Sequence, residues 1–267
     1  MMITFDLLLF ATTFIFGTAI GSFLNVWSRR LLRGKPPTGR SRCEHCKHVL
    51  GFFDLIPLIS FAALRGKCRY CKKPLSWQYP IVELGTGLLF AAIALTTNYS
   101  LSREAGIAIS DRVLTTIPLL IAASALIVIL VTDFSDQVIF DQVIWVALGG
   151  AIGYRLLAQF MIYDLLGALG VYLFLQTVRI LTKKRGMGEG DPPLGFVAAL
   201  LVGWPAVLVE LFLAFTIGGA VGAGLVLAGK NRLKDRIAFG PFIVIATFAT
   251  LFFGDKLLSW YLGFLGL

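Results

Sequence analysis

Long apolar runs separated by short polar segments constrain this chain more than any other feature of its sequence. Hydrophobic residues make up 57% of the 267 residues and charged residues only 15%, with a mean hydropathy of +0.83, which is too apolar for a soluble domain. Because a helix satisfies its own backbone hydrogen bonds in lipid, we predict an all-α, polytopic membrane protein. About eight transmembrane helices are expected, at Leu7 to Val26, Tyr79 to Thr97, Val113 to Thr132, Val143 to Phe160, Leu165 to Leu181, Pro193 to Trp204, Ala206 to Gly229 and Ala238 to Phe253.

Two of these runs need comment. The sixth is shorter than the roughly 20 residues that cross the hydrocarbon core, and Gly203-Trp204-Pro205 interrupts its end, so seven spans are the alternative. The first run follows Met1 to Asp6, which contains no basic residue, and no small-residue cleavage site follows it. We therefore expect a retained span rather than a cleaved signal peptide.

Positive charge predicts the orientation. The polar segment from Arg29 to Lys73 has twelve Lys and Arg against only Glu44 and Asp54, which is typical of a cytoplasmic loop. With eight spans and both termini outside, two further basic groups lie on the same side: Lys183, Lys184 and Arg185, and Lys230, Arg232, Lys234 and Arg236. We expect this basic surface to attract anionic lipid head groups; with no soluble domain to read bases, we expect no nucleic-acid partner.

All four cysteines lie in the basic loop, in two close pairs. Cys43 and Cys46 form the first pair, and Cys68 and Cys71 form the second, with 21 residues between the pairs. Two such pairs can close a tetrahedral zinc site, whereas a cytoplasmic location argues against disulfides; redox pairs or free thiols are the alternatives. A site with four sulfur ligands is closed and structural, so His45 and His48 are expected to be loop residues.

Two acidic motifs stand at the boundaries of apolar runs. Asp133 ends the third run, and Gly188-Glu189-Gly190-Asp191 precedes the sixth. Carboxyl groups are costly near hydrocarbon, and a Gly-flanked aspartate has a permissive backbone, so the pair suits an aspartyl protease at a bilayer. The alternative is that both are solvated loop residues. Asp136 and Asp141 compete with Asp133, although we expect both to be polar boundary residues.

Several motifs together resemble the bacterial prepilin peptidase family, also called type IV leader peptidases. They are Gly21-Ser22-Phe23-Leu24-Asn25-Val26, the paired cysteines, Tyr79-Pro80-Ile81-Val82-Glu83-Leu84, Asp133, Gly188-x-Gly190-Asp191 and Phe239-Gly240-Pro241-Phe242. The resemblance covers nearly the whole chain. It implies an inner-membrane enzyme that removes the leader of type IV prepilins or type II secretion pseudopilins after a Gly, at the cytoplasmic face. It also implies N-methylation of the new N-terminus with S-adenosylmethionine.

The resemblance also implies roles for individual residues. The catalytic aspartates fall on Asp133 and Asp191, with Gly188 and Gly190 in the catalytic loop. Two departures from the family pattern affect the fine shape of the site. Phe140 stands where the family has Pro, and Pro192-Pro193 follow Asp191 where the family usually has a Lys shortly afterwards. Proline suits the first turn of the next helix, so the architecture should survive.

The methyltransferase site is less visible in the sequence. No Gly-rich loop follows a strand, so a site for S-adenosylmethionine would be built from spans and the cysteine loop, and Asn25 and Glu83 are the cofactor-binding candidates. The alternative is that both are interhelical hydrogen-bond partners. We expect residues 1–111 to form a methyltransferase-like lobe, with a zinc loop at about 28–78, and residues 112–267 to form the peptidase lobe.

Three other functions compete with this interpretation. A proton-coupled transporter could use Glu83, Asp133 and Glu210 as a relay, but the chain has no internal repeat. An assembly scaffold would explain the cysteines and not the aspartates. An intramembrane protease of the presenilin or signal-peptide-peptidase type would share the Gly-x-Gly-Asp chemistry and leave the cysteine loop unexplained.

Overall fold

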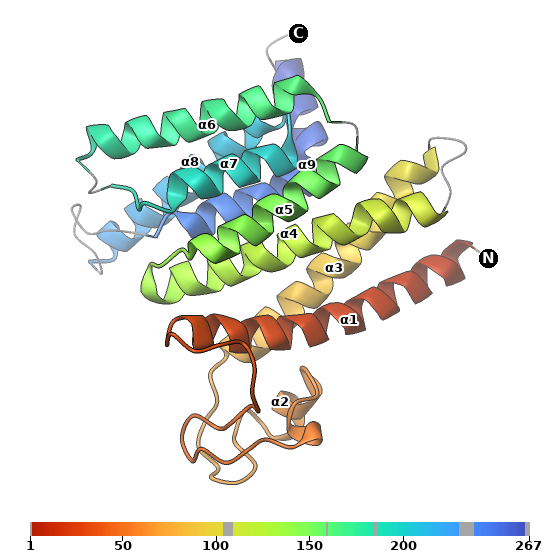
Figure 1. Ribbon diagram of the computed structural model, residues 1–267, viewed down its shortest axis with the longest axis vertical. Coiled ribbons are helices and arrows are strands. Elements are labelled where there is room, and N and C mark those ends of the chain that lie inside the picture. Colours follow the sequence, from red (N-terminus) through yellow and green to blue (C-terminus); the bar gives the residue numbers. More distant parts are fainter. Residues whose placement is uncertain (1, 104–108, 159, 184–185, 230–237, 265–267) are drawn as a thin grey trace. The chain divides into compact units, whose positions relative to one another are not determined.

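The computed structural model describes residues 2–103, 109–158, 160–183, 186–229 and 238–264, and over these residues the protein is helical, with two isolated β-bridges and no strand. This confirms the predicted all-α class. The elements in chain order are α1 (Met2–Leu31), the 3-10 helix η1 (Phe52–Asp54), α2 (Ile59–Ala63), α3 (Gln78–Arg103), α4 (Ile109–Asp136), α5 (Asp141–Leu157), α6 (Ile162–Leu181), α7 (Asp191–Val202), α8 (Val207–Leu227) and α9 (Gly240–Phe264) (Figure 1).

Each predicted apolar run corresponds to a helix. Five described segments are long and apolar enough to cross a membrane: Phe5–Leu31, Gln78–Thr97, Val113–Asp136, Ile162–Leu181 and Val207–Leu227. The chain is therefore a multi-pass membrane protein. Helix α7 and the Gly240–Gly254 part of α9 are apolar but shorter, so a count of eight spans goes beyond what length and composition establish. The basic residues Lys184, Arg185, Lys230, Arg232, Lys234 and Arg236 lie outside the described residues.

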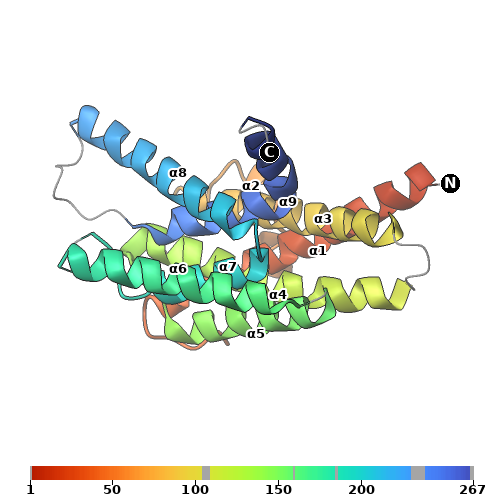
Figure 2. The ribbon, with the colours of Figure 1, turned by 90° about the horizontal axis from the view of Figure 1, so that it is seen from above.

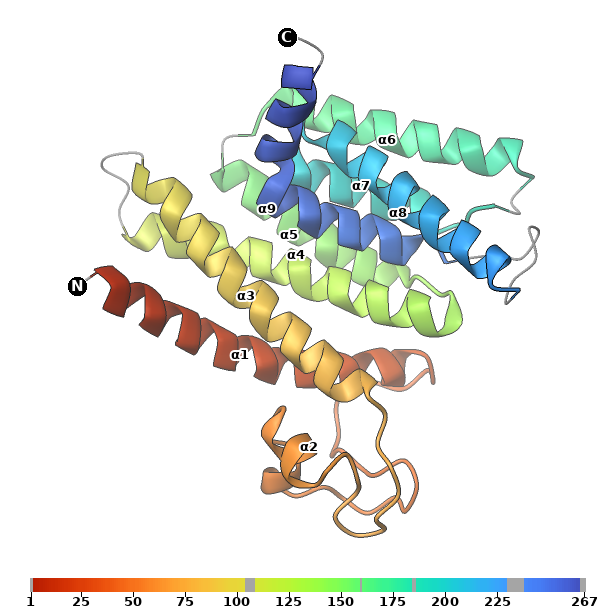
Figure 3. The same ribbon diagram turned by 180° about the vertical axis from the view of Figure 1, so that it is seen from behind.

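The chain divides into two compact units, residues 1–116 and 117–267. In the first unit α1 and α3 pack along each other, and residues 32–77, here called the cysteine loop, connect them (Figures 1 and 3). A Cβ added to Gly17 would lie 2.8 Å from the Cβ of Phe90, and one added to Gly21 would lie 2.8 Å from the Cβ of Thr86. The Gly17-x3-Gly21 pattern thus allows close packing of α1 against α3.

In the second unit α7 is the central helix. It contacts α5, α6, α8 and α9, and Figure 2 shows it among the helices of this unit. Almost all of its side chains are buried, because the helix is apolar on every face. Pro192 and Pro193 occupy its first turn, as predicted, and Gly203, with φ of +81°, ends it. At 12 residues it is about 18 Å long, which explains the short sixth run.

Candidate active site and metal centre

Asp133 and Asp191 line one pocket in the second unit. Asp133 lies near the end of α4 and Asp191 is the first residue of α7, and both are buried, with 4% and 3% of their surface exposed. The pocket has a volume of about 280 Å³. Gln137, Val138, Ile139, Met187, Glu189, Ala238 and Phe239 also line it, together with Gly186, Gly188 and Gly190. Two carboxyl groups 58 positions apart in the sequence therefore line the same pocket.

The two carboxyl groups have different surroundings. Asp191 Oδ2 accepts a hydrogen bond from the backbone N–H of Gly188 at 2.7 Å, so the loop before α7 holds this side chain in place. Asp133 Oδ2 is buried and makes no hydrogen bond of normal geometry with the described residues. An oxygen with spare accepting capacity next to a second carboxyl group is suited to share a proton or to bind a water molecule.

The glycines of this site provide space rather than an unusual backbone conformation. Gly190 has φ of −81°, which any residue can adopt, and Gly188 is not among the residues with positive φ. However, a Cβ on Gly190 would lie 2.6 Å from the Cβ of Ile139, and a Cβ on Gly240 would lie 2.5 Å from Asp133 Oδ2. The permissive backbone predicted beside Asp191 stays a prediction, because Gly190 adopts a conformation that is open to any residue. What requires glycine at positions 190 and 240 in this structure is close packing.

The competing aspartates lie outside the pocket. Asp136 and Asp141 are exposed and do not contribute to its lining. Phe140, where the family has Pro, is the residue before α5 and has an extended backbone, so α5 still begins at Asp141. Glu210, considered above as part of a proton relay, accepts a hydrogen bond from Thr247 at 3.1 Å and lines neither cavity described here.

Arg179 is a residue of this region that the sequence analysis missed. It lies in the last turn of α6, is buried, and forms an ion pair with the exposed Glu189 of the loop before α7. The pair anchors the loop that carries Gly188 and Gly190 to α6. The sequence does show a basic residue in the last turn of this apolar helix. The helix dipole favours such a residue there in any case, so the pattern alone does not indicate a role at the site.

The four cysteines form a cluster in the first unit. Their Sγ atoms all lie within 4.8 Å of one another, and those of Cys43 and Cys71 are 3.9 Å apart. Zinc with Zn–S bonds of about 2.3 Å requires tetrahedral sulfur atoms roughly 3.8 Å apart, so the cluster fits one metal ion. Burial raises the pKa of the Cys43 thiol, but hydrogen bonds from the backbone of Cys46 and His45 and from neighbouring thiols outweigh burial and lower it to about 6. Thiolate is the form that binds metal.

Two matching turns build this cluster. The N–H of Cys43 donates to the carbonyl of His48, and the N–H of Cys68 donates to that of Lys73, both at 2.9 Å. Each turn contains a Lys with positive φ, Lys47 at 59° and Lys72 at 57°. The histidines link the turns: His45 Nε2 lies 3.2 Å from the carbonyl oxygen of Pro74, and the ring of His48 lies 3.7 Å from that of Tyr70. Neither histidine belongs to the four-sulfur cluster.

A second cavity of about 630 Å³, here called the basic cavity, lies between the cysteine loop and the ends of α1 and α3. This volume is in the range of small-molecule sites. Glu83 lines it, and one of its oxygens accepts a hydrogen bond from the N–H of Leu58 at 2.8 Å. Eight basic residues share the lining: Arg29, Arg30, Arg33, Lys35, Arg40, Arg42, Lys47 and Arg69. Glu83 forms no ion pair with any described residue.

Asn25 does not belong to this lining. It is fully buried in α1, and its Oδ1 accepts a hydrogen bond from Gln78 Nε2 at 3.0 Å, which joins α1 to the start of α3. Its Nδ2 has no hydrogen-bond partner among the described residues. Of the two candidates for cofactor binding, only Glu83 therefore faces a cavity.

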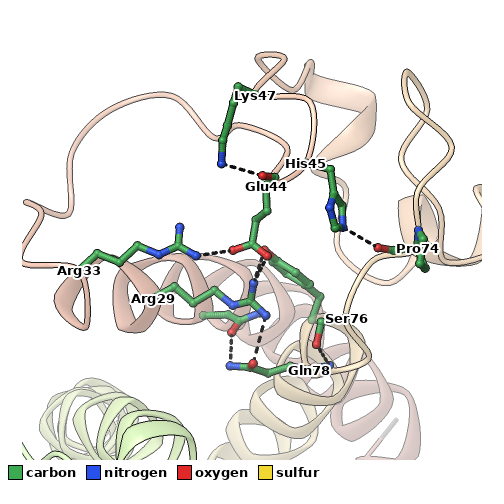
Figure 4. A network of polar contacts seen from close by, with 10 residues as sticks. Arg29, Arg33, Glu44, His45, Lys47, Pro74, Ser76 and Gln78 are labelled. Atoms are coloured by element: carbon green, nitrogen blue, oxygen red, sulfur yellow. Dashed lines mark hydrogen bonds and ion pairs between the residues drawn. The ribbon is translucent and has the colours of Figure 1, made fainter.

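The other acidic residues of the basic cavity are neutralised by arginines. Glu44 pairs with Arg29 at 2.7 Å and Arg33 at 3.0 Å, and Arg29 also reaches Gln78 at 3.1 Å (Figure 4). Burial raises the pKa of Glu44, but hydrogen bonds and charge from Arg29, then Arg33, outweigh burial and hold it below its usual value. Asp54 pairs similarly with Arg69 at 2.5 Å.

Comparison with known proteins identifies relatives along almost the whole chain. The "Bacterial Peptidase A24 N-terminal domain" matches residues 15–97, and the "Type IV leader peptidase family" matches residues 120–223. The "Prepilin leader peptidase/N-methyltransferase" of Aeromonas hydrophila is 33% identical, over 96% of this chain and 94% of its own length. The protein of the same name from Bacillus subtilis (strain 168) is 30% identical, over 93% and 96%. No solved structure shows a significant match.

Proposed function

Because the chain belongs to the type IV leader peptidase family, we propose that it is a bifunctional prepilin leader peptidase and N-methyltransferase. Its substrates would be type IV prepilins or type II secretion pseudopilins, cut after a Gly and then methylated at the new N-terminus. The observation that carries the peptidase assignment is the shared pocket of Asp133 and Asp191. Mass spectrometry of a co-expressed pilin tests the proposal, because one mass reports both the cut site and the added methyl group.

We propose that Asp133 and Asp191 catalyse the cleavage together. Two neighbouring carboxyl groups share one proton, so one can take a proton from water while the other protonates the peptide carbonyl oxygen. The resulting hydroxide attacks the carbonyl carbon, and the C–N bond breaks as a proton is returned to the leaving amine. The titration belongs to the pair, so neither residue is assigned as the base.

The proposed topology has eight spans, with both termini outside and the cysteine loop and aspartate pocket facing the cytoplasm. The excess of Lys and Arg in the cysteine loop supports this orientation. Asp191 is the first residue of α7, which has only 12 residues. A carboxyl group at the end of such a short apolar helix fits a site at the membrane boundary. A bacterial inner (cytoplasmic) membrane location, in contact with anionic lipid, follows from this topology and the family.

We further propose that methylation belongs to residues 1–111 and peptide hydrolysis to residues 112–267. The basic cavity would bind S-adenosylmethionine, which supplies the methyl group when bound. Glu83, the acidic residue of this cavity without an ion pair among the described residues, suits a positively charged centre of the ligand, and the arginines of the cavity suit its carboxylate. Asn25 would support the site by fixing α1 to α3. An intramembrane protease with other substrates is the second candidate, since the Gly-x-Gly-Asp motif is common to both.

Zinc would hold the cysteine loop in shape through Cys43, Cys46, Cys68 and Cys71. We expect about one zinc ion per chain in protein purified without chelators, measured by atomic emission. Cys68→Ser should release the metal and impair methylation more than cleavage, because the cluster belongs to the first unit and the aspartates to the second. Lys73→Ala, which changes an exposed side chain of the same loop outside the lining of the basic cavity, is the control. Absence of zinc, or an equal loss of both activities, would contradict this prediction.

The packing of Gly190 against Ile139 gives a prediction for the peptidase. Gly190→Ala should lower leader cleavage by roughly 10- to 100-fold, because the new methyl group would displace Ile139 or the loop that holds Asp191. Ile139→Ala in the same chain should restore much of the activity by removing the obstructing side chain. If Ile139→Ala gives no rescue, steric overlap is not the reason for the glycine.

A further inference from the structure

The segment Gly51–Leu64 of the cysteine loop, here called the apolar insert, has a composition unlike the rest of that loop. Only Asp54 and Ser60 are polar among its 14 residues, whereas twelve Lys and Arg surround it between Arg29 and Lys73. Three of its large side chains are mostly exposed: 78% of Phe52, 72% of Phe53 and 65% of Ile59. A loop in water would leave these side chains in contact with solvent, at a cost of about 1 kcal/mol or more each.

The apolar insert lies beside the membrane-spanning parts of α1 and α3. Leu58 donates its N–H to Glu83, which is five residues inside the span Gln78–Thr97, or about 8 Å along the helix axis. Ser22 and Val26, within the span Phe5–Leu31, line the basic cavity together with Ser60 and Phe61 of the insert. The insert therefore lies beside residues that belong to the candidate spans of α1 and α3.

The one charged group of the apolar insert and several of its backbone N–H groups have partners within the protein, which lowers the cost of entry into lipid. Asp54 accepts hydrogen bonds from the N–H of Gly51 at 3.1 Å and from Tyr70 at 3.2 Å, and its charge is paired with Arg69. The N–H groups of Ser60, Ala62 and Leu64 donate to the carbonyl groups of Ile56, Leu58 and Ser60, in and around α2. The exposed side chains of Phe52, Phe53 and Ile59 have no polar atoms that would need hydrogen-bond partners in lipid.

The flanks of the apolar insert match a membrane interface. Trp77, which is 71% exposed, immediately precedes α3, and Trp is enriched at the level of lipid head groups. Lys47 lies before the insert, and Arg65 and Lys67 follow it. Such cations around an apolar segment suit a leaflet with anionic head groups.

We propose that the apolar insert is a re-entrant membrane element, with Phe52, Phe53 and Ile59 in contact with lipid acyl chains of the leaflet on the side of the cysteine loop. A 14-residue apolar segment is too short to span the bilayer and has the length of a re-entrant or interfacial element. The element holds the cysteine loop against α1 and α3 and so closes one side of the basic cavity. The proposal concerns where the loop lies and does not depend on either enzymatic activity.

Photolabelling tests the proposal directly. The full chain is reconstituted into vesicles of phosphatidylethanolamine and phosphatidylglycerol that contain a phospholipid with a diazirine near the middle of an acyl chain. After irradiation, mass spectrometry compares lipid adducts on peptides from residues 51–64 with those from residues 35–50 of the same loop. We expect roughly fivefold or greater labelling of residues 51–64, because residues 35–50 are polar and basic. Equal labelling of the two peptides places the insert in water and overturns the proposal.

A pair of variants locates the contact. Phe53→Asp should reduce the adducts on residues 51–64, whereas Phe53→Leu, which keeps an apolar side chain, should retain them. Zinc content and thermal unfolding of both variants report whether the loop is intact. If an intact Phe53→Asp protein is labelled as strongly as the parent, Phe53 does not contact acyl chains and the proposal fails. If Phe53→Asp does not fold, the comparison of the two parental peptides still decides.

Discussion

Replacing either Asp133 or Asp191 by Asn should lower leader cleavage by roughly 10³-fold or more while the protein remains inserted in the membrane. Asn keeps the size of the side chain, but it cannot take a proton from water or share one with the other residue. Because the two carboxyl groups would act as a pair, the double variant should be no less active than either single variant. Cleavage of a purified prepilin in detergent, followed by mass spectrometry, measures all three.

Matched controls come from the same region. Asp136→Asn and Asp141→Asn remove exposed carboxyl groups that lie close in sequence to Asp133 and outside the pocket, so both variants should cleave at nearly the parental rate. Near-parental cleavage by Asp133→Asn would make that assignment wrong, with Asp136 and Asp141 next in line. Near-parental cleavage by Asp191→Asn would remove the Gly-x-Gly-Asp motif from the mechanism.

The sequence predicted the helices well because hydrophobicity and turn residues are local signals. The eight apolar runs correspond to α1 and α3 to α9, and the short α7 follows from the Gly203 that ends it. The same signals say little about why individual glycines occur. The need for Gly190 depends on Ile139, about fifty positions earlier, and no local pattern reports that contact.

The cysteine loop shows the same limit. Spacing alone indicated a four-sulfur cluster, since close pairs of cysteines are a local pattern. The left-handed conformations of Lys47 and Lys72 could not be predicted, because Lys has no preference for positive φ and only the tight turns impose it. The contact of Leu58 with Glu83 joins residues 25 positions apart, so the basic cavity and the place of the apolar insert beside α3 could not be predicted from the sequence.

Glu83→Gln should separate the two proposed activities. The amide oxygen can still accept the hydrogen bond from Leu58, so the loop should keep its place, while the negative charge facing the basic cavity is lost. We expect methylation to fall by roughly 100-fold, as for loss of a charged contact worth about 3 kcal/mol, and cleavage to stay within about twofold of the parent. The pilin would then be cut and left unmethylated.

Asn25→Ala is the variant with which the loss of methylation in Glu83→Gln should be compared. It removes the buried hydrogen bond from Gln78 and leaves the cavity lining unchanged, so the helix pair α1 and α3 should lose about 1 kcal/mol of stability. A lower unfolding temperature in detergent together with reduced methylation would identify Asn25 as a packing residue. Lost methylation at normal stability would instead support a role of Asn25 in cofactor binding.

Binding of S-adenosylhomocysteine, measured by calorimetry, shows for Glu83 too whether a variant has lost ligand binding or only stability. Normal binding and normal methylation in a stable Glu83→Gln protein would remove Glu83 from the methyl-donor site.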